Sequence, residues 1–236
     1  MLFFNLLLAI RLSCCSVDHG VFYSEWTSPP DPSILMPADG SPLFLIVPIH
    51  VDNSLGVTNS SPLYKWFLAS LSQHLHIVDL GVCAKFLSMV IMQDRSSRKL
   101  WLSSHLYVAD LLAEWNLSQC KVAQIPLPVA VLKLVMQDDL LDDASLPHYQ
   151  CLVGCLMYLA VMMQPDIAFA AMWLGQFSSK PSRSHFLAAK HVLCYLAGTP
   201  TLCLSFSTSI LLPSVLQEYM KIFGCTDADW ASDSRN

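Results

Sequence analysis

The apolar run CLVGCLMYLAVMM, from Cys151 to Met163, constrains the fold of this chain more than any other segment. It is 13 residues long and ends at Gln164-Pro165-Asp166, whereas a helix that crosses a bilayer needs about 20 apolar residues. The run therefore predicts a buried helix rather than a membrane span. Apolar spacing and stop signals predict three helices in this region, over 147–162, 165–177 and 182–197, with Gly198 ending the last.

The nine cysteines, an odd number, show no zinc-ligand spacing and make a poor disulfide framework. Cys151 and Cys155 lie one helical turn apart inside the apolar run, where we expect thiols packed in the core. A reduced, intracellular protein of the cytoplasm or nucleus, not a secreted one, is the resulting expectation. The apolar stretch Leu2 to Ile10 has no basic flank before it and contains Asn5, which favours an amphipathic buried helix over the alternative, a signal peptide.

The stretch IVPIHVDNSLGVTNS, from Ile46 to Ser60, contains a carboxylate and an amide side by side at Asp52-Asn53. The β-prone run 43–49 before it predicts a strand covered on both faces. Pro48 confines that strand to a sheet edge or to a distortion, because proline has no N–H to donate. With 55–58 as the returning strand, the residues alone leave two alternatives open: an ordinary hairpin turn, or a metal site with one ligand changed.

A second hairpin is indicated by two β-prone segments, 86–92 and 100–102, that bracket a polar turn from Asp94 to Lys99. We expect the basic residues of this turn, Arg95, Arg98 and Lys99, to be solvated. Helices are predicted after Ser61-Pro62 and from about Ser104 to Asn116. The charge balance, 13 basic against 18 acidic side chains, argues against tight binding to a phosphate backbone, which depends on Lys and Arg.

Several blocks of the sequence resemble one family. DHGVFYSEW (18–26), IHVDNSLGVTNS (49–60), HIVDLGVCAKFLSMVI (76–91) and LWLSSHLYVADLL (100–112) occur in an order similar to the reverse transcriptase of copia-type retrotransposon polyproteins. The long block from Tyr149 to Thr199 resembles the helical region of the same polyproteins. GCTDADWASD, near the end of the chain, resembles the first strand of their ribonuclease H domain.

This resemblance implies an α+β fold in four parts. An incomplete reverse-transcriptase palm, with β-hairpins packed on helices, would cover residues 1–125, followed by an acidic linker over 126–146. A helical region like the thumb or connection would cover 147–215, and a truncated start of ribonuclease H would cover 216–236. By the same resemblance, the fingers and the strand carrying a further metal ligand would precede Met1.

The resemblance also implies the site. The family copies RNA into DNA with two divalent metals, Mg²⁺ or Mn²⁺, held by adjacent aspartates at a hairpin turn and by a third aspartate upstream. Asp52 matches the first of the adjacent pair, Asn53 stands at the degenerate second position, and His50 replaces the family's tyrosine. Asp227 matches the first aspartate of the ribonuclease H site, which is incomplete here. We expect Asp52 and Asp227 to be vestigial, weak metal ligands.

The functional expectation is a fragment of an RNA-directed DNA polymerase, a nucleotidyltransferase with ribonuclease H, that is inactive on its own. Its RNA/DNA template-primer partner is expected to bind weakly or not at all, with no membrane partner and with self-association through an exposed sheet edge. Two alternatives stand beside it. One is a residual nucleic-acid-binding or polymerase subunit completed by another chain; the other, suggested by a mean hydropathy of +0.47, is a membrane-associated or structural protein.

Overall fold

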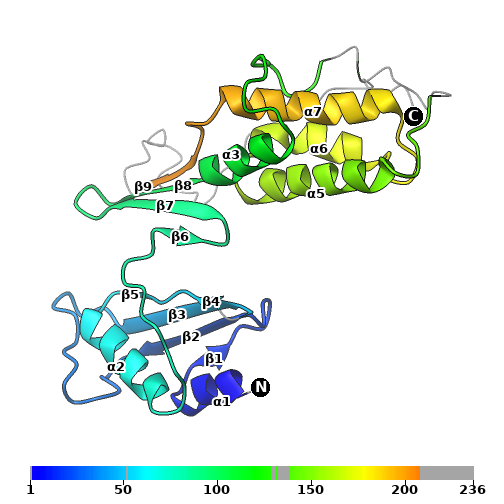
Figure 1. Ribbon diagram of the computed structural model, residues 1–236. Helices are drawn as coiled ribbons and strands as arrows, with labels where there is room; N and C mark the ends of the chain where they lie inside the picture. Colours follow the sequence, from blue (N-terminus) through cyan, green and yellow to red (C-terminus); the bar gives the residue numbers. More distant parts are fainter. Residues whose placement is uncertain (1, 52, 129–130, 132–138, 208–236) are drawn as a thin grey trace, which may run out of the picture. The chain divides into compact units, whose positions relative to one another are not determined.

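The computed structural model describes residues 2–51, 53–128, 131 and 139–207, in two compact units that divide between Ser88 and Met89 (Figure 1). The described residues form six α-helices and two antiparallel sheets, so the predicted mixed α and β composition is confirmed. Within this part of the chain, no helix has both the length and the apolar character needed to span a membrane.

The first unit contains a twisted sheet with two helices (Figure 1). Its strands run in the order β1-β2-β3-β4, and β5 also pairs with β3. The predicted N-terminal helix is confirmed as α1, and the helix predicted after Ser61-Pro62 is confirmed as α2. The bounds are α1 Leu2–Ala9, β1 Ser13–Cys14, β2 Val21–Trp26, β3 Leu43–His50, β4 Asn53–Ser54, β5 Val57–Thr58 and α2 Ser61–Ser72.

Only one face of β3 is buried. Leu43, Leu45 and Val47 lie in the core with Leu63 of α2, whereas Ile46 on the opposite face is 39% exposed. The prediction that this strand is covered on both faces is therefore wrong. Because the run is apolar throughout, the sequence shows no alternation of apolar and polar residues that would mark an open face. The side chains nevertheless alternate between the two faces of the sheet.

Pro48 distorts the sheet as predicted, but inside it and not at an edge. Strand β3 is central, because β2 pairs with one side and both β4 and β5 pair with the other. The pairs Ile46↔Val57 and Ile49↔Ser54 share one register. The pairing of β3 with β4 and β5 is therefore interrupted between these two pairs, but the register of the strands does not shift. Pro48 lies in this interruption and keeps one contact across it, because its carbonyl accepts a hydrogen bond from Leu55 N (3.1 Å).

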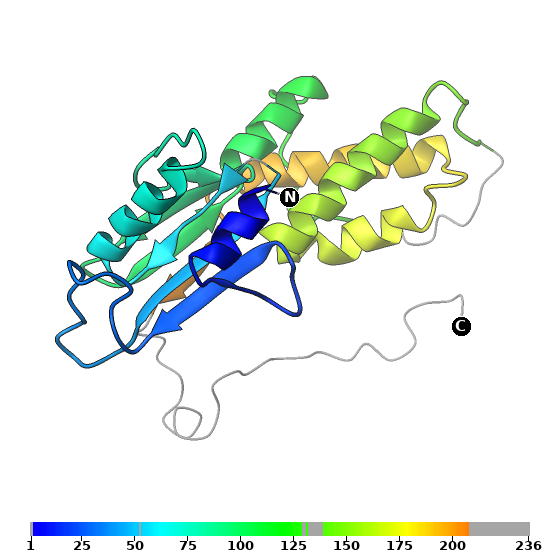
Figure 2. The ribbon, with the colours of Figure 1, turned by 90° about the horizontal axis from the view of Figure 1, so that it is seen from below.

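The second unit combines a strand layer with a helical group (Figures 1 and 2). The strand order is β6-β7-β8-β9, in which β6 (Lys85–Phe86) precedes the division between the units. The predicted hairpin around 94–99 is confirmed, but a single strand over 86–92 is wrong, because Leu87 and Ser88 turn with φ values of 46° and 62°. The other bounds are β7 Met89–Asp94, β8 Lys99–Ser103, α3 His105–Glu114, α5 Leu146–Met162, η1 Pro165–Ile167, α6 Ala168–Gly175, α7 Arg183–Gly198 and β9 Leu204–Ser207.

Helices α5, α6 and α7 pack together around the main apolar cluster of this unit (Figure 2). The predicted buried helix is confirmed as α5, whose inner face carries Leu152, Leu156 and Leu159. Cys151 is exposed and Cys155 is half-buried, so the prediction that both thiols lie in the core is wrong for Cys151. An apolar run marks the helix but not its buried face, and Cys151 falls outside that face.

Candidate functional site

The hairpin that resembles the polymerase metal site is present in the first unit. Strand β3 ends at His50, which pairs with Asn53 at the start of β4, so the connecting loop is two residues long. The loop therefore begins one residue earlier than the turn expected around Asp52-Asn53. Asp52 itself lies outside the described residues. His50, Val51 and Asn53 are all exposed.

Val51, the first loop residue, has φ = 57° and is 87% exposed. Two-residue hairpin loops favour residues with positive φ, which glycine and asparagine adopt readily. A β-branched side chain in this left-handed region costs roughly 1–2 kcal/mol. The hairpin thus holds strained backbone at the position next to the candidate metal ligand.

Replacement of Val51 by glycine is expected to stabilise the first unit by about 1 kcal/mol, because glycine adopts positive φ without strain. Urea denaturation followed by circular dichroism measures the change. Val57→Gly is the matched control: Val57 is an exposed strand residue of the same unit, and this change should destabilise by about 0.5–1 kcal/mol. Equal losses in the two variants would contradict the strain at Val51.

A second loop lies beside the end of β3. Ile49 N donates to the carbonyl of Gly20 (2.7 Å), and Gly20 N donates to Oδ1 of Asp18 (2.8 Å). The sequence did not predict that Asp18 approaches this end of the strand, because only the β2–β3 register brings the two segments together. The Asp18 carboxylate is engaged in its own turn. Among the residues that the structure describes, no group of three His, Cys, Asp or Glu side chains could hold a metal ion.

Asp227, the candidate ribonuclease H ligand, lies outside the described residues, so its role stays a prediction. Part of the acidic linker is described. Asp139 approaches Arg183 with an oxygen-to-nitrogen distance of 4.0 Å, and both side chains are largely exposed. Asp142 Oδ1 accepts a hydrogen bond from Ser145 N (3.1 Å) at the start of α5. Asp142 therefore serves the local structure at the start of α5, whereas the approach of Asp139 is to a distant residue and lies in solvent.

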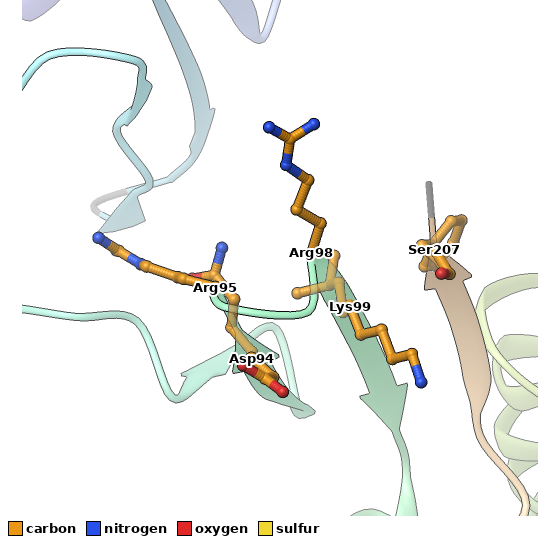
Figure 3. A pocket seen from close by; sticks show the side chains of 8 residues that line it. Asp94, Arg95, Arg98, Lys99 and Ser207 are labelled. Carbon is orange, nitrogen blue, oxygen red and sulfur yellow. The ribbon is translucent and has the colours of Figure 1, made fainter. Parts of the chain in front are cut away.

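The second unit carries a shallow hollow of about 480 Å³ beside the β7–β8 turn (Figure 3). We call it the basic hollow, because three exposed cations border it, Arg95, Arg98 and Lys99. Figure 3 shows their side chains extending in three different directions. Strand β9 supplies the opposite wall through Phe206 and Ser207, and Ser207 pairs with Lys99. The sequence predicted the solvated turn but not the hollow, which depends on this long-range pairing.

Asp94 is the acidic residue of the basic hollow. The Ser96 hydroxyl (2.6 Å) and the Ser97 hydroxyl (2.6 Å) both donate to its carboxylate. These hydrogen bonds, that from Ser96 first, lower the pKa of Asp94 to about 2. Asp94 is therefore ionised at neutral pH and offsets one of the three positive charges. The remaining charge can attract a phosphate only weakly, because the cations diverge and are screened by solvent.

No protein-family model and no solved structure matches the chain. Curated relatives do. The chain is 34% identical over 212 residues to the retrovirus-related Pol polyprotein from transposon TNT 1-94 of Nicotiana tabacum. This match covers 87% of this chain and 15% of that polyprotein. The chain is also 34% identical over 186 residues to the corresponding polyprotein from transposon RE1 of Arabidopsis thaliana (78% of this chain, 12% of the relative) and 32% identical over 186 residues to that from RE2 (79% and 12%).

These three relatives are all retrovirus-related Pol polyproteins, and each match covers most of this chain. The chain spans only 12–15% of the length of these three curated relatives. Similarity at this level over about 190 to 210 residues covers strands and helices of both units. The chain belongs to the family of retrovirus-related Pol polyproteins from copia-type transposons, of which it matches one segment.

Proposed function

We propose that the chain is a reverse-transcriptase segment of a copia-type Pol polyprotein and that it is catalytically inactive on its own. The observation that carries the proposal is the β3–β4 hairpin, a two-residue turn after an apolar strand with Asp52-Asn53 where the family has two aspartates. Residues 1–125 correspond to part of the palm and 147–215 to a region like the thumb or connection. Residues 216–236 correspond to the start of ribonuclease H. The Pol relatives support this proposal over a membrane-associated or structural protein.

The predicted inactivity follows from the charge of the hairpin. Two-metal phosphoryl transfer requires clustered carboxylate oxygens, because Mg²⁺ and Mn²⁺ are hard cations that must be held close to the attacking and leaving oxygens. Asn53 offers a neutral carbonyl oxygen in place of a carboxylate. The residues before Asp18 include no aspartate or glutamate, so this stretch supplies no further acidic ligand. In our proposal Asp52 and Asp227 bind Mg²⁺ or Mn²⁺ weakly and do not support catalysis.

The proposed partners follow the same logic. We propose that an RNA/DNA template-primer binds weakly, with the exposed cations of the basic hollow as the main contact. The net charge of −5 opposes this binding. Self-association through an unpaired edge of the first sheet, and an intracellular location in cytoplasm or nucleus, complete the proposal.

The Asn53→Asp variant tests the proposed origin of the hairpin. A second carboxylate next to Asp52 should raise the affinity for Mn²⁺ roughly tenfold, because it adds a full negative charge within a few ångströms of the ion. Titration with Mn²⁺, followed by electron paramagnetic resonance, measures free and bound ion. Asn5→Asp is the matched control, the same charge change at an exposed residue of α1. A gain no larger than that of the control would contradict a metal-binding origin.

A further inference from the structure

An exposed acidic stretch precedes helix α5 in the second unit. It spans residues 139–143, and we call it the acidic segment. Three of its side chains are exposed carboxylates: Asp139, Asp142 and Asp143. Leu140 stands between them and is 54% exposed, although it is a large apolar residue. Arg183 approaches Asp139, so three negative charges less one positive charge (3 − 1) leave the segment with a net charge of about −2.

Backbone hydrogen bonds hold the acidic segment at the start of α7. Leu141 N donates to the Pro181 carbonyl (2.9 Å). In the opposite direction, Arg183 N donates to the Asp139 carbonyl (3.1 Å). The exposed side chains of the segment are therefore presented on a fixed backbone, which lowers the conformational entropy that is lost when a partner binds them.

The basic hollow is complementary to the acidic segment. Three cations border the hollow, and the ionised Asp94 offsets one of them (3 − 1), which leaves a net charge of about +2. Leu100 and Phe206 add apolar surface to its lining, and Phe206 is 50% exposed. An exposed leucine flanked by carboxylates fits such a hollow, because apolar surface is buried while opposite charges meet around it.

The acidic segment lies far from the basic hollow of its own chain. The segment is attached to the start of α7, whereas β9, which forms one wall of the hollow, follows the end of that helix. Helix α7 has 16 residues and is therefore about 24 Å long. Figure 1 shows the start of α7 and the β7–β8 turn at opposite ends of the second unit. An acidic segment in the hollow must therefore come from another copy of the chain.

We propose that the basic hollow binds the acidic segment of a second copy of this chain. Leu140 of one copy contacts Leu100 and Phe206 of the other, and the carboxylates of the segment lie against the cations of the hollow. Each copy carries one hollow and one acidic segment, so the contact is heterologous and joins copies head to tail. It differs from self-association through a sheet edge, which depends on backbone hydrogen bonds and not on these charges.

The basic hollow is also the proposed contact for a template-primer, so the two occupants compete for it. The acidic segment fits the geometry better, because the three cations diverge and suit carboxylates spaced along a segment more than they suit one phosphate group (Figure 3). The net charge of −5 on each chain does not prevent the contact at about 0.1 M salt, where the Debye length is about 10 Å and only nearby charges interact strongly.

Sedimentation velocity of the full chain, over a series of protein concentrations at about 0.1 M salt, tests the proposal. We expect Arg98→Glu and Asp143→Lys each to lower the association constant about tenfold, because each variant places like charges together in the contact. An equimolar mixture of the two variants should recover association, since the unaltered hollow of one fits the unaltered segment of the other. About 1 M salt should weaken association of the wild-type chain, because the Debye length falls to about 3 Å.

Two matched controls repeat the charge changes at exposed residues outside both surfaces. Lys65→Glu on α2 and Asp110→Lys on α3 should leave the association constant unchanged. Circular dichroism verifies that each variant is folded. A wild-type chain that stays monomeric, losses equal to those of the controls, or a mixture that associates no more than its components would overturn the proposal. Arg98→Glu that weakens retardation of a template-primer but leaves self-association intact would assign the hollow to nucleic acid and would also overturn it.

Discussion

The His185→Ala variant is expected to lose about 3–4 kcal/mol of the free energy of unfolding. The imidazole is fully buried and stacks on the ring of Phe177, with centroids 3.9 Å apart. Its Nδ1 accepts a hydrogen bond from Ser182 N (3.0 Å), while the Ser182 hydroxyl accepts one from His185 N (3.3 Å). The two residues form a capping box at the start of α7. Loss of the cap costs about 1 kcal/mol, and loss of a buried ring costs about 2–3 kcal/mol more.

Urea denaturation of the full chain, followed by circular dichroism at helix wavelengths, measures this loss. His185→Gln should recover part of it, because a glutamine oxygen at this position can also accept from the backbone N–H of the cap. His191→Ala is the matched control on the same helix. That half-buried side chain makes one hydrogen bond to Ile125, so its removal should cost about 1 kcal/mol. A His185→Ala loss no greater than the control would contradict the role assigned to the buried ring.

Tyr149→Ala is expected to cost about 4 kcal/mol. The side chain is fully buried between helices, packs edge-to-face on Phe186 with ring centroids 6.1 Å apart, and donates from its hydroxyl to the Leu174 carbonyl (2.7 Å). Removal of a ring of this size leaves a cavity in the centre of the second unit. Tyr149→Phe keeps the ring and loses only the hydrogen bond between α5 and α6, so it should cost about 1 kcal/mol. The same urea titration measures both.

Tyr195→Phe is the control for the hydroxyl. Tyr195 donates to Asp166 (2.8 Å) near the surface, and loss of that hydrogen bond should cost less than about 0.5 kcal/mol.

Alkaline pH gives a second readout, because burial raises the pKa of Tyr149 above its ordinary value. The contribution of the buried, neutral Tyr149 to stability is complete below a pH of about 10, near the pKa of a tyrosine in the unfolded chain. It falls as the pH rises further, because the Tyr149 hydroxyl then ionises readily only in the unfolded chain. Tyr149→Phe should lose less stability above that pH than wild type. Equal alkaline losses in both would contradict this assignment.

Helices were the part of the fold that the sequence predicted well. The segments that became α2, α3, α5 and α7 carry apolar residues at helical spacing between clear start and stop signals, and each of these helices forms with boundaries close to those predicted. One failure is the single strand predicted over 86–92, which a turn divides. Two others concern which side of an element faces inward. Cys151 lies outside the buried face of α5, and β3 has an open face, because the partner elements that decide burial are distant in the chain.

The candidate site was likewise predicted only where it depends on residues close together in the sequence. The hairpin at 50–53 was predicted from a local pattern, an apolar run followed by a polar turn and a returning strand, and it is present. The approach of Asp18 to the end of β3 and the wall that β9 gives to the basic hollow were not predicted. Both depend on the register of strands distant in sequence. The four-part domain scheme and the roles of Asp52, Asn53 and Asp227 stay predictions.

Primer extension by the purified chain on an RNA template, with Mg²⁺ or Mn²⁺, tests most directly whether this family member is an inactive polymerase segment. With a neutral amide at Asn53, the chain should incorporate no nucleotide above the background of Asp52→Asn. Asn53→Asp should also remain inactive, because one restored carboxylate does not complete a two-metal site. Incorporation by the wild-type chain that depends on metal and disappears in Asp52→Asn would contradict the account.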